Sequence, residues 1–306
     1  MNGKEKILIT GATGCIGSNL VNTLLQNSTY HLALVVRDTN KAKSLFYDKV
    51  SCISSKCKDF KEKIVDFSPD IVIHLASYSS SSDELCEINK LIESNIIFTS
   101  ILLDTLSECN VKLFINTGSF SEYYNNDDIP SPTYFYSATK ISASSIIDYY
   151  SKKNNFKVIN AILYTVYGKK TINKKIIDYA IESLESNNSI NMSDGWQVLD
   201  FIYIDDVVRF YTNIIYNFKK LSINHKNYFV GTAKGISIRE LIQILEKITN
   251  KKANINWGVI QDRVMDTKKA VANIYNAKNE LQWSANYDIH TGLKKYLNEL
   301  NGNKNV

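Results

Sequence analysis

The stretch KILITGATGCIGSNLVNTLL, residues 6–25, decides the fold of this chain of 306 residues. A short apolar run is followed by a glycine-rich turn, Gly11 to Gly17, and apolar residues then recur at helical spacing. In a turn between a strand and a helix, small residues let the backbone approach a pyrophosphate, which then faces the first turn of the helix. The stretch therefore predicts a dinucleotide site at the start of the chain.

Further apolar runs alternate with helix-like stretches along the first half of the sequence. The runs are residues 31–36, 71–75, 111–116 and 157–164, and the helix-like stretches include 84–108 and 134–153. This alternation predicts right-handed crossovers and a doubly wound parallel sheet of the α/β class.

The pattern loosens after residue 165. It predicts a helix at 173–185, a polar loop at 186–195, a strand at 201–204, a helix from Asp205, a strand at 228–230 and a helix at 238–249. We expect a dinucleotide-binding domain over 1–165 and a smaller mixed α/β substrate-binding part over 166–306. Elements from about 201–235 are expected to return to the first domain.

Composition excludes several classes of protein. The net charge of +5 is spread along the chain, which suits an anionic small molecule better than nucleic acid. No apolar run reaches the roughly 18 residues of a membrane span, so we expect a cytoplasmic protein without a membrane partner. The five cysteines are odd in number and form no CxxC pair, which predicts neither disulfides nor a metal site.

The residues after the second apolar run bear on the choice of dinucleotide. An acidic residue there accepts hydrogen bonds from the ribose hydroxyls of NAD, whereas an arginine pairs with the extra phosphate of NADP. Arg37 stands at this strand end and Asp38 follows it. The sequence thus favours NADPH and leaves NADH possible.

A tyrosine four residues before a lysine can act as a proton donor beside a cation. Chance produces this spacing easily, and the chain has three such pairs: Tyr136/Lys140, Tyr149/Lys153 and Tyr216/Lys220. Context selects the first, because it opens the helix that follows the strand ending in NTGS, which carries Thr117 and Ser119. Ligands of a parallel sheet gather beyond these strand ends, so Ser119, Tyr136 and the glycine turn should converge.

These motifs resemble the extended short-chain dehydrogenase/reductase family of nucleotide-sugar epimerases, dehydratases and ketoreductases, which has a Rossmann-type fold. The similar segments are TGATGCIG at 10–17, HLA at 74–76, Asn95, YxxxK at 136–140, VYG at 166–168 and DFIYIDDVV at 200–208. FINTGSF, NYFVGTAKGIS and WGVIQDRVMD are more narrowly similar to CDP-abequose and CDP-paratose synthases. Those reductases use NADPH on the 4-keto group of a CDP-4-keto-3,6-dideoxyhexose.

The resemblance implies a role for each matching residue. Tyr136 would exchange the proton with the sugar oxygen, Lys140 would hold the nicotinamide ribose and lower the pKa of Tyr136, and Ser119 would polarise the carbonyl. The implied cofactor-binding residues are Gly11, Thr13, Gly14, Cys15, Ile16, Gly17, Arg37, Leu75, Ala76, Ser77, Asn95, Thr117, Tyr136, Lys140 and Tyr164. Ser119, Trp196 and Arg263 are the implied substrate-binding residues.

The resemblance also separates reaction types. Family dehydratases place an Asp-Glu pair after the catalytic hydroxyl residue, where this chain has Phe120 and Ser121. The favoured reaction is an NADPH-dependent 4-ketoreduction for bacterial surface polysaccharide, such as the O-antigen of lipopolysaccharide. A 4-epimerase with bound NAD is the alternative, and a non-catalytic NADP-sensing or scaffold protein is the alternative of another class.

Some positions depart from the family pattern or carry a second interpretation. Ile162, Leu199 and Lys169 replace family residues, which puts the nucleotide part of the substrate in doubt. The nucleotide (CDP, dTDP or GDP), the sugar and its C4 configuration all stay open. His74 is expected to be a packed or backbone-bonded residue. Trp196 could equally cover a loop, and Asp205 and Asp206 are expected to serve a helix N-terminus. The resemblance and the apolar stripes of 84–108 and 134–153 predict a homodimer.

Overall fold

The computed structural model describes residues 4–302 except 28, 83, 127–128, 171–173, 222–224 and 264. Within these residues the largest sheet has seven parallel strands in the order β10-β6-β5-β4-β1-β2-β3. The strands are β1 (Glu5–Thr10), β2 (Tyr30–Val36), β3 (Ser51–Ser54), β4 (Ile71–His74), β5 (Leu113–Ser119), β6 (Lys157–Leu163) and β10 (His225–Val230). The strand order reverses at β1, and ligands of such sheets bind beyond the carboxyl ends at this point.

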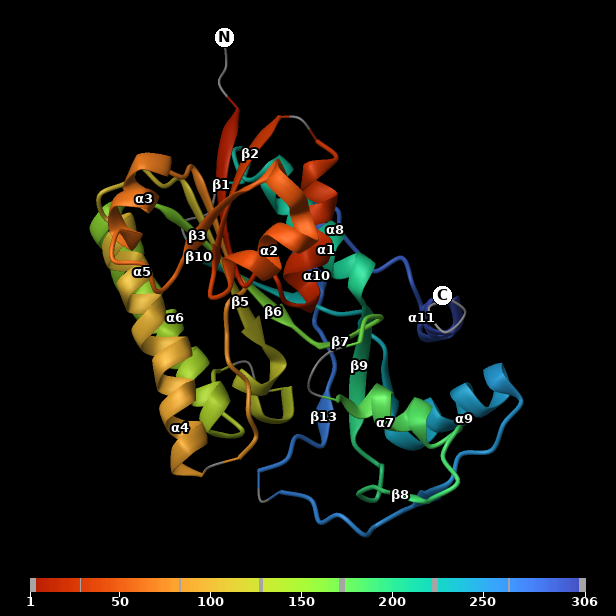
Figure 1. Cartoon of the computed structure of the whole chain (residues 1–306). Helices are drawn as coiled ribbons and strands as arrows, with labels where there is room; N and C mark the ends of the chain where they lie inside the picture. The colour runs from red at the N-terminus through yellow and green to blue at the C-terminus, as the bar shows by residue number, and fades with distance from the viewer. Residues whose placement is uncertain are drawn as a thin grey trace.

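Helices cover both faces of the sheet (Figure 1). One face carries α1 (Cys15–Leu25), α2 (Thr39–Phe46) and α8 (Ile204–Asn217), and the other carries α3 (Phe60–Phe67), α5 (Phe98–Leu106) and α6 (Phe135–Asn154). Successive strand residues serve opposite cores, because Ile7 and Ile9 pack in one apolar cluster and Leu8 packs in the other. Burial on both faces explains why the strands read as continuous apolar runs.

The predicted α/β class and parallel sheet are confirmed. The runs at 31–36, 71–75 and 157–164 match β2, β4 and β6 to within one residue at each end. The run at 111–116 is β5, which continues to Ser119, so Thr117 and Ser119 belong to the strand itself. The stretch at 84–108 divides into α4 (Leu85–Ile92), a π-helical turn η2 (Glu93–Ile97) and α5.

The sequence prediction missed β3. This strand is short, lies at the edge of the sheet and pairs with β2. Its sequence, SCIS, carries one buried side chain, Ile53, between polar or half-buried neighbours. Four such residues give no apolar run that periodicity could detect.

A second part of the chain surrounds β9 (Val198–Tyr203). Strand β9 pairs with β7 (Thr165–Tyr167), β11 (Gly235–Ser237) and β13 (Lys269–Ala270). Strand β8 (Ile190–Asn191), which lies inside the stretch predicted as a loop, pairs with β12 (Ile255–Asn256). Helix α9 (Ile238–Thr249) has the predicted bounds. Helix α7 (Ile176–Glu182) is shorter than the predicted 173–185, and Asn173 lies outside the described residues.

The chain returns to the first sheet through two of these later elements. Strand β10 forms one edge of the seven-stranded sheet, and α8 packs against α1. Helices α10 (Tyr275–Leu281) and α11 (Ile289–Gly302) complete the chain. Within the described ranges, no helix has the length and apolar character that crossing a membrane requires.

Two buried carboxylates connect the later segments. Asp200 accepts hydrogen bonds from the backbone nitrogens of Thr232 at 2.8 Å, Ala233 at 2.9 Å and Ala272 at 3.1 Å. Asp206 lies in the first turn of α8, as expected, but α8 has no side-chain cap. Its carboxylate instead accepts from the backbone nitrogens of residues 286 and 287, so the expected capping role is wrong for this residue and the acid holds the C-terminal segment.

A buried histidine connects the strand ends that carry the predicted site. His74 Nδ1 lies 2.8 Å from Thr10 Oγ1, and His74 Nε2 lies 3.0 Å from Thr99 Oγ1. Thr99 donates its proton to the Asn95 carbonyl, and Thr10 Oγ1 accepts from the Ala76 nitrogen. Both hydroxyl groups are therefore satisfied only when neutral His74 carries its proton on Nε2. The packed role expected for His74 agrees with this, although its partners are side chains and not backbone.

Burial lowers the pKa of His74 to about 3. Because the folded pKa lies below the usual 6.5, the unfolded chain binds more protons between about pH 3 and 6.5, and the free energy of unfolding rises with pH across this window. We expect His74→Gln to reduce that slope by up to about 1.4 kcal/mol per pH unit. Denaturant unfolding of both proteins from pH 4 to 8 measures it.

The comparison between wild type and variant cancels the contributions of other titrating groups. His31, exposed at the start of β2, supplies the matched control, and His31→Gln should alter the slope far less. Equal slopes for wild type and His74→Gln would contradict a neutral His74.

Candidate active site

The glycine turn between β1 and α1 is built on close backbone contacts. Gly11 has a positive φ of 70°, and a Cβ there would lie 2.6 Å from the Ala76 nitrogen. A Cβ on Gly17 would lie 2.3 Å from the Gly11 oxygen. Helix α1 begins after Gly14 with no side-chain cap and no acidic residue in its first turn. Its first N–H groups can therefore bind an anion, as a dinucleotide pyrophosphate requires.

The predicted turn residues all lie in this feature. Gly14 is exposed, its nitrogen donates to the Gly11 oxygen at 3.0 Å, and Thr13, Cys15 and Ile16 are half-buried around it. Ile16 also packs against the core on its side of the sheet.

The loop after β4 faces the glycine turn and is held by Asn95. The Asn95 amide donates to the Tyr78 carbonyl at 2.9 Å and to Thr139 Oγ1 at 3.0 Å. Its oxygen accepts from the Tyr78 nitrogen at 2.9 Å and from Ser77 Oγ at 3.0 Å. All the hydrogen-bonding capacity of Asn95 is thus used within the protein, so the residue positions the loop that contains Leu75, Ala76 and Ser77.

Arg37 and Asp38 differ in what they offer to a ligand at the end of β2. The Asp38 carboxylate caps α2 by accepting from the nitrogens of Asn40 at 2.9 Å and Lys41 at 3.0 Å. The Arg37 side chain is exposed and forms no hydrogen bond or ion pair with the described part of the chain. The acid is engaged while the guanidinium is available.

Ser119, Tyr136 and Lys140 surround one buried acid, Glu122. The Ser119 nitrogen donates to Glu122 Oε1 at 2.7 Å, and Glu122 acts electrostatically on both Tyr136 and Lys140. The Tyr136 hydroxyl also lies beside Ser77. This contact connects the loop after β4 with the first turn of α6. The structure thus brings Ser119 and Tyr136 to the same buried acid, and their convergence with the glycine turn stays a prediction.

Burial shapes the acid–base properties of this site. Desolvation raises the pKa of Tyr136 well above its usual value, and the nearby Tyr134 and Glu122 raise it further. Desolvation lowers the pKa of Lys140, while the charge of Glu122 opposes that effect. The expectation that Lys140 depresses the pKa of Tyr136 is therefore wrong for the protein alone, because burial dominates and Glu122 adds a negative charge.

The Lys140 amine has no partner inside the described structure. The residue is 3% exposed, and its Nζ forms no hydrogen bond or ion pair with any described residue. Burial disfavours the charged form of this amine, so it is open to hydrogen-bond acceptors from a ligand. By contrast, Tyr149 and Tyr216 of the other two Tyr/Lys pairs are 60% and 66% exposed, which leaves Tyr136/Lys140 as the pair with a catalytic environment.

Thr117 and Tyr164 already use their hydroxyl groups. Thr117 Oγ1 lies 2.6 Å from the hydroxyl of Tyr211 on α8. The hydroxyl of Tyr164 donates to Asn126 Oδ1 at 3.2 Å, and its ring stacks on Phe120. Both residues can line a groove, but neither offers a free polar group in this arrangement.

Glu122 is the site residue that the sequence reasoning missed. It is 3% exposed and closes the short helical turn η3 (Phe120–Glu122), with Ser119 as its N-cap. Burial raises the pKa of its carboxyl group to about 7. The signal was present, because Ser119-x-x-Glu122 is a capping-box pattern.

Arg263 is connected to Tyr136 through the ring of Tyr134. Its guanidinium carbon lies 5.7 Å from the ring centre of Tyr134, and that ring stacks on Tyr136 at 5.8 Å. Arg263, which the sequence predicts to bind the substrate, therefore lies one ring away from Tyr136.

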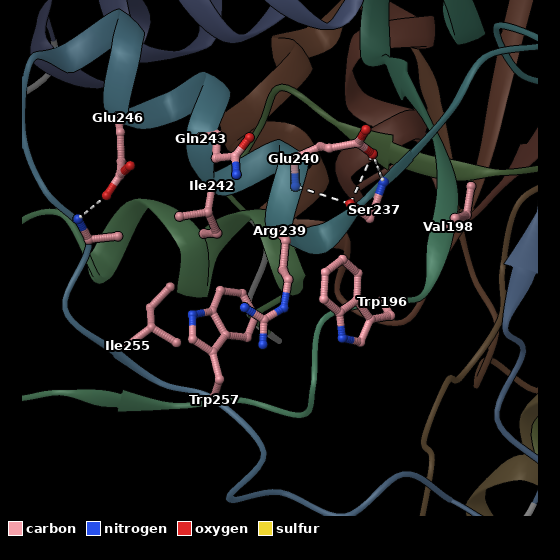
Figure 2. A pocket seen from close by; sticks show the side chains of 11 residues that line it. Trp196, Val198, Ser237, Arg239, Glu240, Ile242, Gln243, Glu246, Ile255 and Trp257 are labelled. Carbon is pink, nitrogen blue, oxygen red and sulfur yellow. Dashed lines mark hydrogen bonds between the residues drawn. The ribbon is translucent and has the colours of Figure 1, made fainter.

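Trp196 lies in a different environment (Figure 2). It lines a groove of about 520 Å³ with residues of α9 and β12, and its lining includes none of Ser119, Tyr136 and Lys140. The Arg239 guanidinium is stacked between the rings of Trp196 and Trp257, at 4.6 and 4.5 Å from their centres. Trp196 is nevertheless 68% exposed. The lining of this groove includes neither Ser119 nor Arg263, the other predicted substrate residues.

The sequence is similar to a known protein family and to named proteins. Residues 7–231 match the model of the NAD dependent epimerase/dehydratase family. The chain is 30% identical to a CDP-abequose synthase of Salmonella muenchen over 96% of this chain and 97% of that protein. It is 28% identical to a CDP-abequose synthase of Yersinia pseudotuberculosis over 90% and 96%.

A solved structure shows the same fold. The UDP-glucuronic acid 4-epimerase of Bacillus cereus, in complex with UDP-glucuronic acid and NAD, superposes with a TM-score of 0.86 at 27% identity. The match covers 96% of this chain and 99% of the epimerase. Together with the glycine turn and the Ser119, Tyr136 and Lys140 set, the match over residues 7–231 shows that this chain belongs to the NAD dependent epimerase/dehydratase family.

Proposed function

We propose that the protein is an NADPH-dependent nucleotide-sugar 4-ketoreductase. Its substrate is a CDP-4-keto-3,6-dideoxyhexose or a related 4-keto-6-deoxy sugar nucleotide, reduced to the 4-hydroxy sugar for bacterial surface polysaccharide such as O-antigen. The observation that carries the proposal is the complete Ser119, Tyr136 and Lys140 set beside the glycine turn. The similarity to CDP-abequose synthases over nearly the full chain supports the substrate class.

The residues divide the chemistry among them. NADPH, when bound, supplies the hydride to C4. Ser119 donates a hydrogen bond to the C4 carbonyl oxygen, and Tyr136 delivers the proton to that oxygen. The raised pKa of Tyr136 keeps its hydroxyl protonated at neutral pH, which is the form that reduction needs. Lys140 binds the nicotinamide ribose with its otherwise unpartnered amine.

The end of β2 supports NADPH over NADH. Arg37 is free to pair with the adenosine phosphate, whereas Asp38, which could accept hydrogen bonds from NAD ribose hydroxyls, is engaged in capping α2. The same arrangement disfavours the alternative of a 4-epimerase with tightly held NAD.

The residues after Ser119 disfavour dehydration. Phe120 stacks on Tyr164, and Ser121 Oγ lies 2.9 Å from Ser119 Oγ. No carboxylate therefore occupies the two positions that family dehydratases use, and the carboxylate of Glu122 is bonded to the Ser119 backbone. Arg263, beside Tyr134, is suited to bind the diphosphate of the substrate, and Trp196 could contact it only at the periphery.

A homodimer is part of the proposal. Helices α4 and α5 follow each other through η2 as one long helix, and α6 lies beside it on one flank of the molecule (Figure 1). They and η2 expose large apolar side chains: Leu85 at 73%, Ile97 at 48%, Ile101 at 51% and Tyr149 at 60%. Pairing of this flank with its copy would bury them.

We expect light scattering to give twice the chain mass of 34.8 kDa. Ile101→Lys should shift the protein to the monomer, because it places a charge in the paired surface. A monomeric wild type would exclude the dimer and leave the assignment of the catalytic site untouched.

The activity itself is tested with CDP-, dTDP- and GDP-linked 4-keto-6-deoxy and 4-keto-3,6-dideoxy sugars. We expect NADPH oxidation to be fastest with a CDP-linked dideoxy ketone. Tyr136→Phe should reduce the rate by about 10³-fold, because the proton donor is lost. Tyr216→Phe, at the exposed tyrosine of another Tyr/Lys pair, is the matched control and should retain the wild-type rate.

The outcomes separate the alternatives. Oxidation of none of the ketones would exclude the reductase, and a mass spectrum of released cofactor showing NAD would then favour the epimerase. NADPH binding without any turnover, unchanged in Tyr136→Phe, would favour a sensing or scaffold protein.

Cofactor choice is tested at the end of β2. We expect Arg37→Gln to raise the KM for NADPH by about 10- to 100-fold, because a charged hydrogen-bonded pair is lost, and to leave the KM for NADH within about twofold. Lys61→Gln, at a surface cation paired with Glu108, controls for net charge. Equal effects of Arg37→Gln on both cofactors would contradict the assignment.

A further inference from the structure

A buried carboxylate lies directly behind the catalytic serine. Glu122 Oε1 accepts the Ser119 N–H at 2.7 Å, and a Cβ on Gly118 would lie 2.9 Å from the same oxygen. The carboxylate therefore packs closely against the backbone of β5 beside Gly118. The Glu122 carbonyl also accepts from the Ser131 nitrogen at 2.7 Å, which fixes the turn on its other side.

The second oxygen of this carboxylate has no partner. Oε2 of Glu122 and Nζ of Lys140 both belong to side chains that are 3% exposed, and neither atom forms a hydrogen bond with a described residue. Burial disfavours the charged form of both groups, and the charge of each opposes that effect on the other. The charge of Lys140 is the nearby charge that lowers the pKa of Glu122.

The other titratable groups near this pair are few. Tyr123 and Tyr136 face Glu122, and His74 lies near Lys140. Tyr136 is also approached by Tyr134 and by the hydroxyl of Ser77. His74 is neutral and the tyrosines are protonated at neutral pH. Within the described residues, Glu122 is thus the anion available to balance the Lys140 ammonium.

We propose that Glu122 is a positioning residue of the catalytic centre, where one carboxylate oxygen holds the Ser119 backbone and its negative charge keeps the buried Lys140 amine protonated. This inference rests on the proposed function for its effect on turnover. The negative charge also disfavours the tyrosinate form of Tyr136, so it keeps the proton on the group that must deliver it. Glu122 itself touches no reacting atom.

The Glu122 carboxyl group titrates at a pH where enzyme activity can be measured. Burial raises the pKa of Glu122 to about 7, with Lys140 and the Ser119 N–H opposing that effect. The charge is therefore present above pH 7 and lost as pH falls. Glu122→Gln keeps an acceptor for the Ser119 N–H but removes the charge at every pH.

The first test compares kcat/KM of wild type and Glu122→Gln for NADPH-dependent reduction from pH 5.5 to 9. We expect wild type to be about tenfold faster at pH 8 and nearly equal to the variant at pH 5.5, since one pKa unit corresponds to a tenfold change. A purely structural role would give a ratio that is constant with pH, and that result would overturn the proposal. Glu108→Gln, at an exposed acid, is the matched control and should match wild type throughout.

The second test needs neither cofactor nor substrate. Because the folded pKa of Glu122 is above the usual 4.5, the folded chain binds more protons between pH 4.5 and 7, and stability falls as pH rises through this range. The unfolding equilibrium constant of wild type, divided by that of Glu122→Gln, should rise by up to about tenfold per pH unit there. A constant ratio would show that Glu122 does not change charge in this range and would overturn the predicted loss of its charge between pH 7 and 4.5, even if the protein reduces none of the ketones.

A more conservative variant keeps the proposal testable if Glu122→Gln fails to fold. If Glu122→Gln does not fold, Glu122→Asp retains the charge on a shorter side chain. We expect Glu122→Asp to keep a fall in activity on the acid side, with a shifted midpoint, and loss of that pH dependence would count against the proposal.

Discussion

The close approach of three backbone segments at the end of β1 is the constraint on which the site depends. Gly11 contacts the loop after β4, and Gly17 in α1 contacts Gly11 and Ala12, at distances that a side chain would forbid. This packing sets the first turn of α1 against the β4 loop, and Asn95 then holds that loop against α6. The helix that carries Tyr136 and Lys140 is thereby placed relative to the glycine turn through hydrogen bonds and backbone contact.

The parts of this arrangement that are local in sequence could be predicted. The glycine turn is a contiguous pattern, and Tyr136 was separated from two equivalent pairs by its place after a strand end. β3 could not be found, because its four residues carry a single buried side chain. Glu122 was missed although its capping-box spacing was visible, since its importance comes from burial next to Lys140, which no local pattern reports. Trp196 was grouped with the substrate because of the family resemblance, whereas the structure places it against Arg239, which also contacts Trp257.

Removal of water is the common cause of the unusual properties of the site. The same burial favours the neutral forms of His74, Tyr136 and Glu122 and disfavours the charged form of Lys140. The Tyr136 hydroxyl therefore stays protonated at neutral pH. Beside it lie Glu122 and Lys140, two ionisable groups whose charged forms burial disfavours.

The stack of Trp196, Arg239 and Trp257 has a consequence for observing the protein in solution. The chain has three tryptophans, and two of them flank Arg239 in the groove of Figure 2. The third, Trp283, is fully buried against Phe210 beneath α8. Intrinsic indole emission therefore combines one shielded signal with two signals from a single solvent-facing location. A soluble quencher will act mainly on the latter, which makes the natural fluorescence of the chain a local reporter of the contact between α9 and β12.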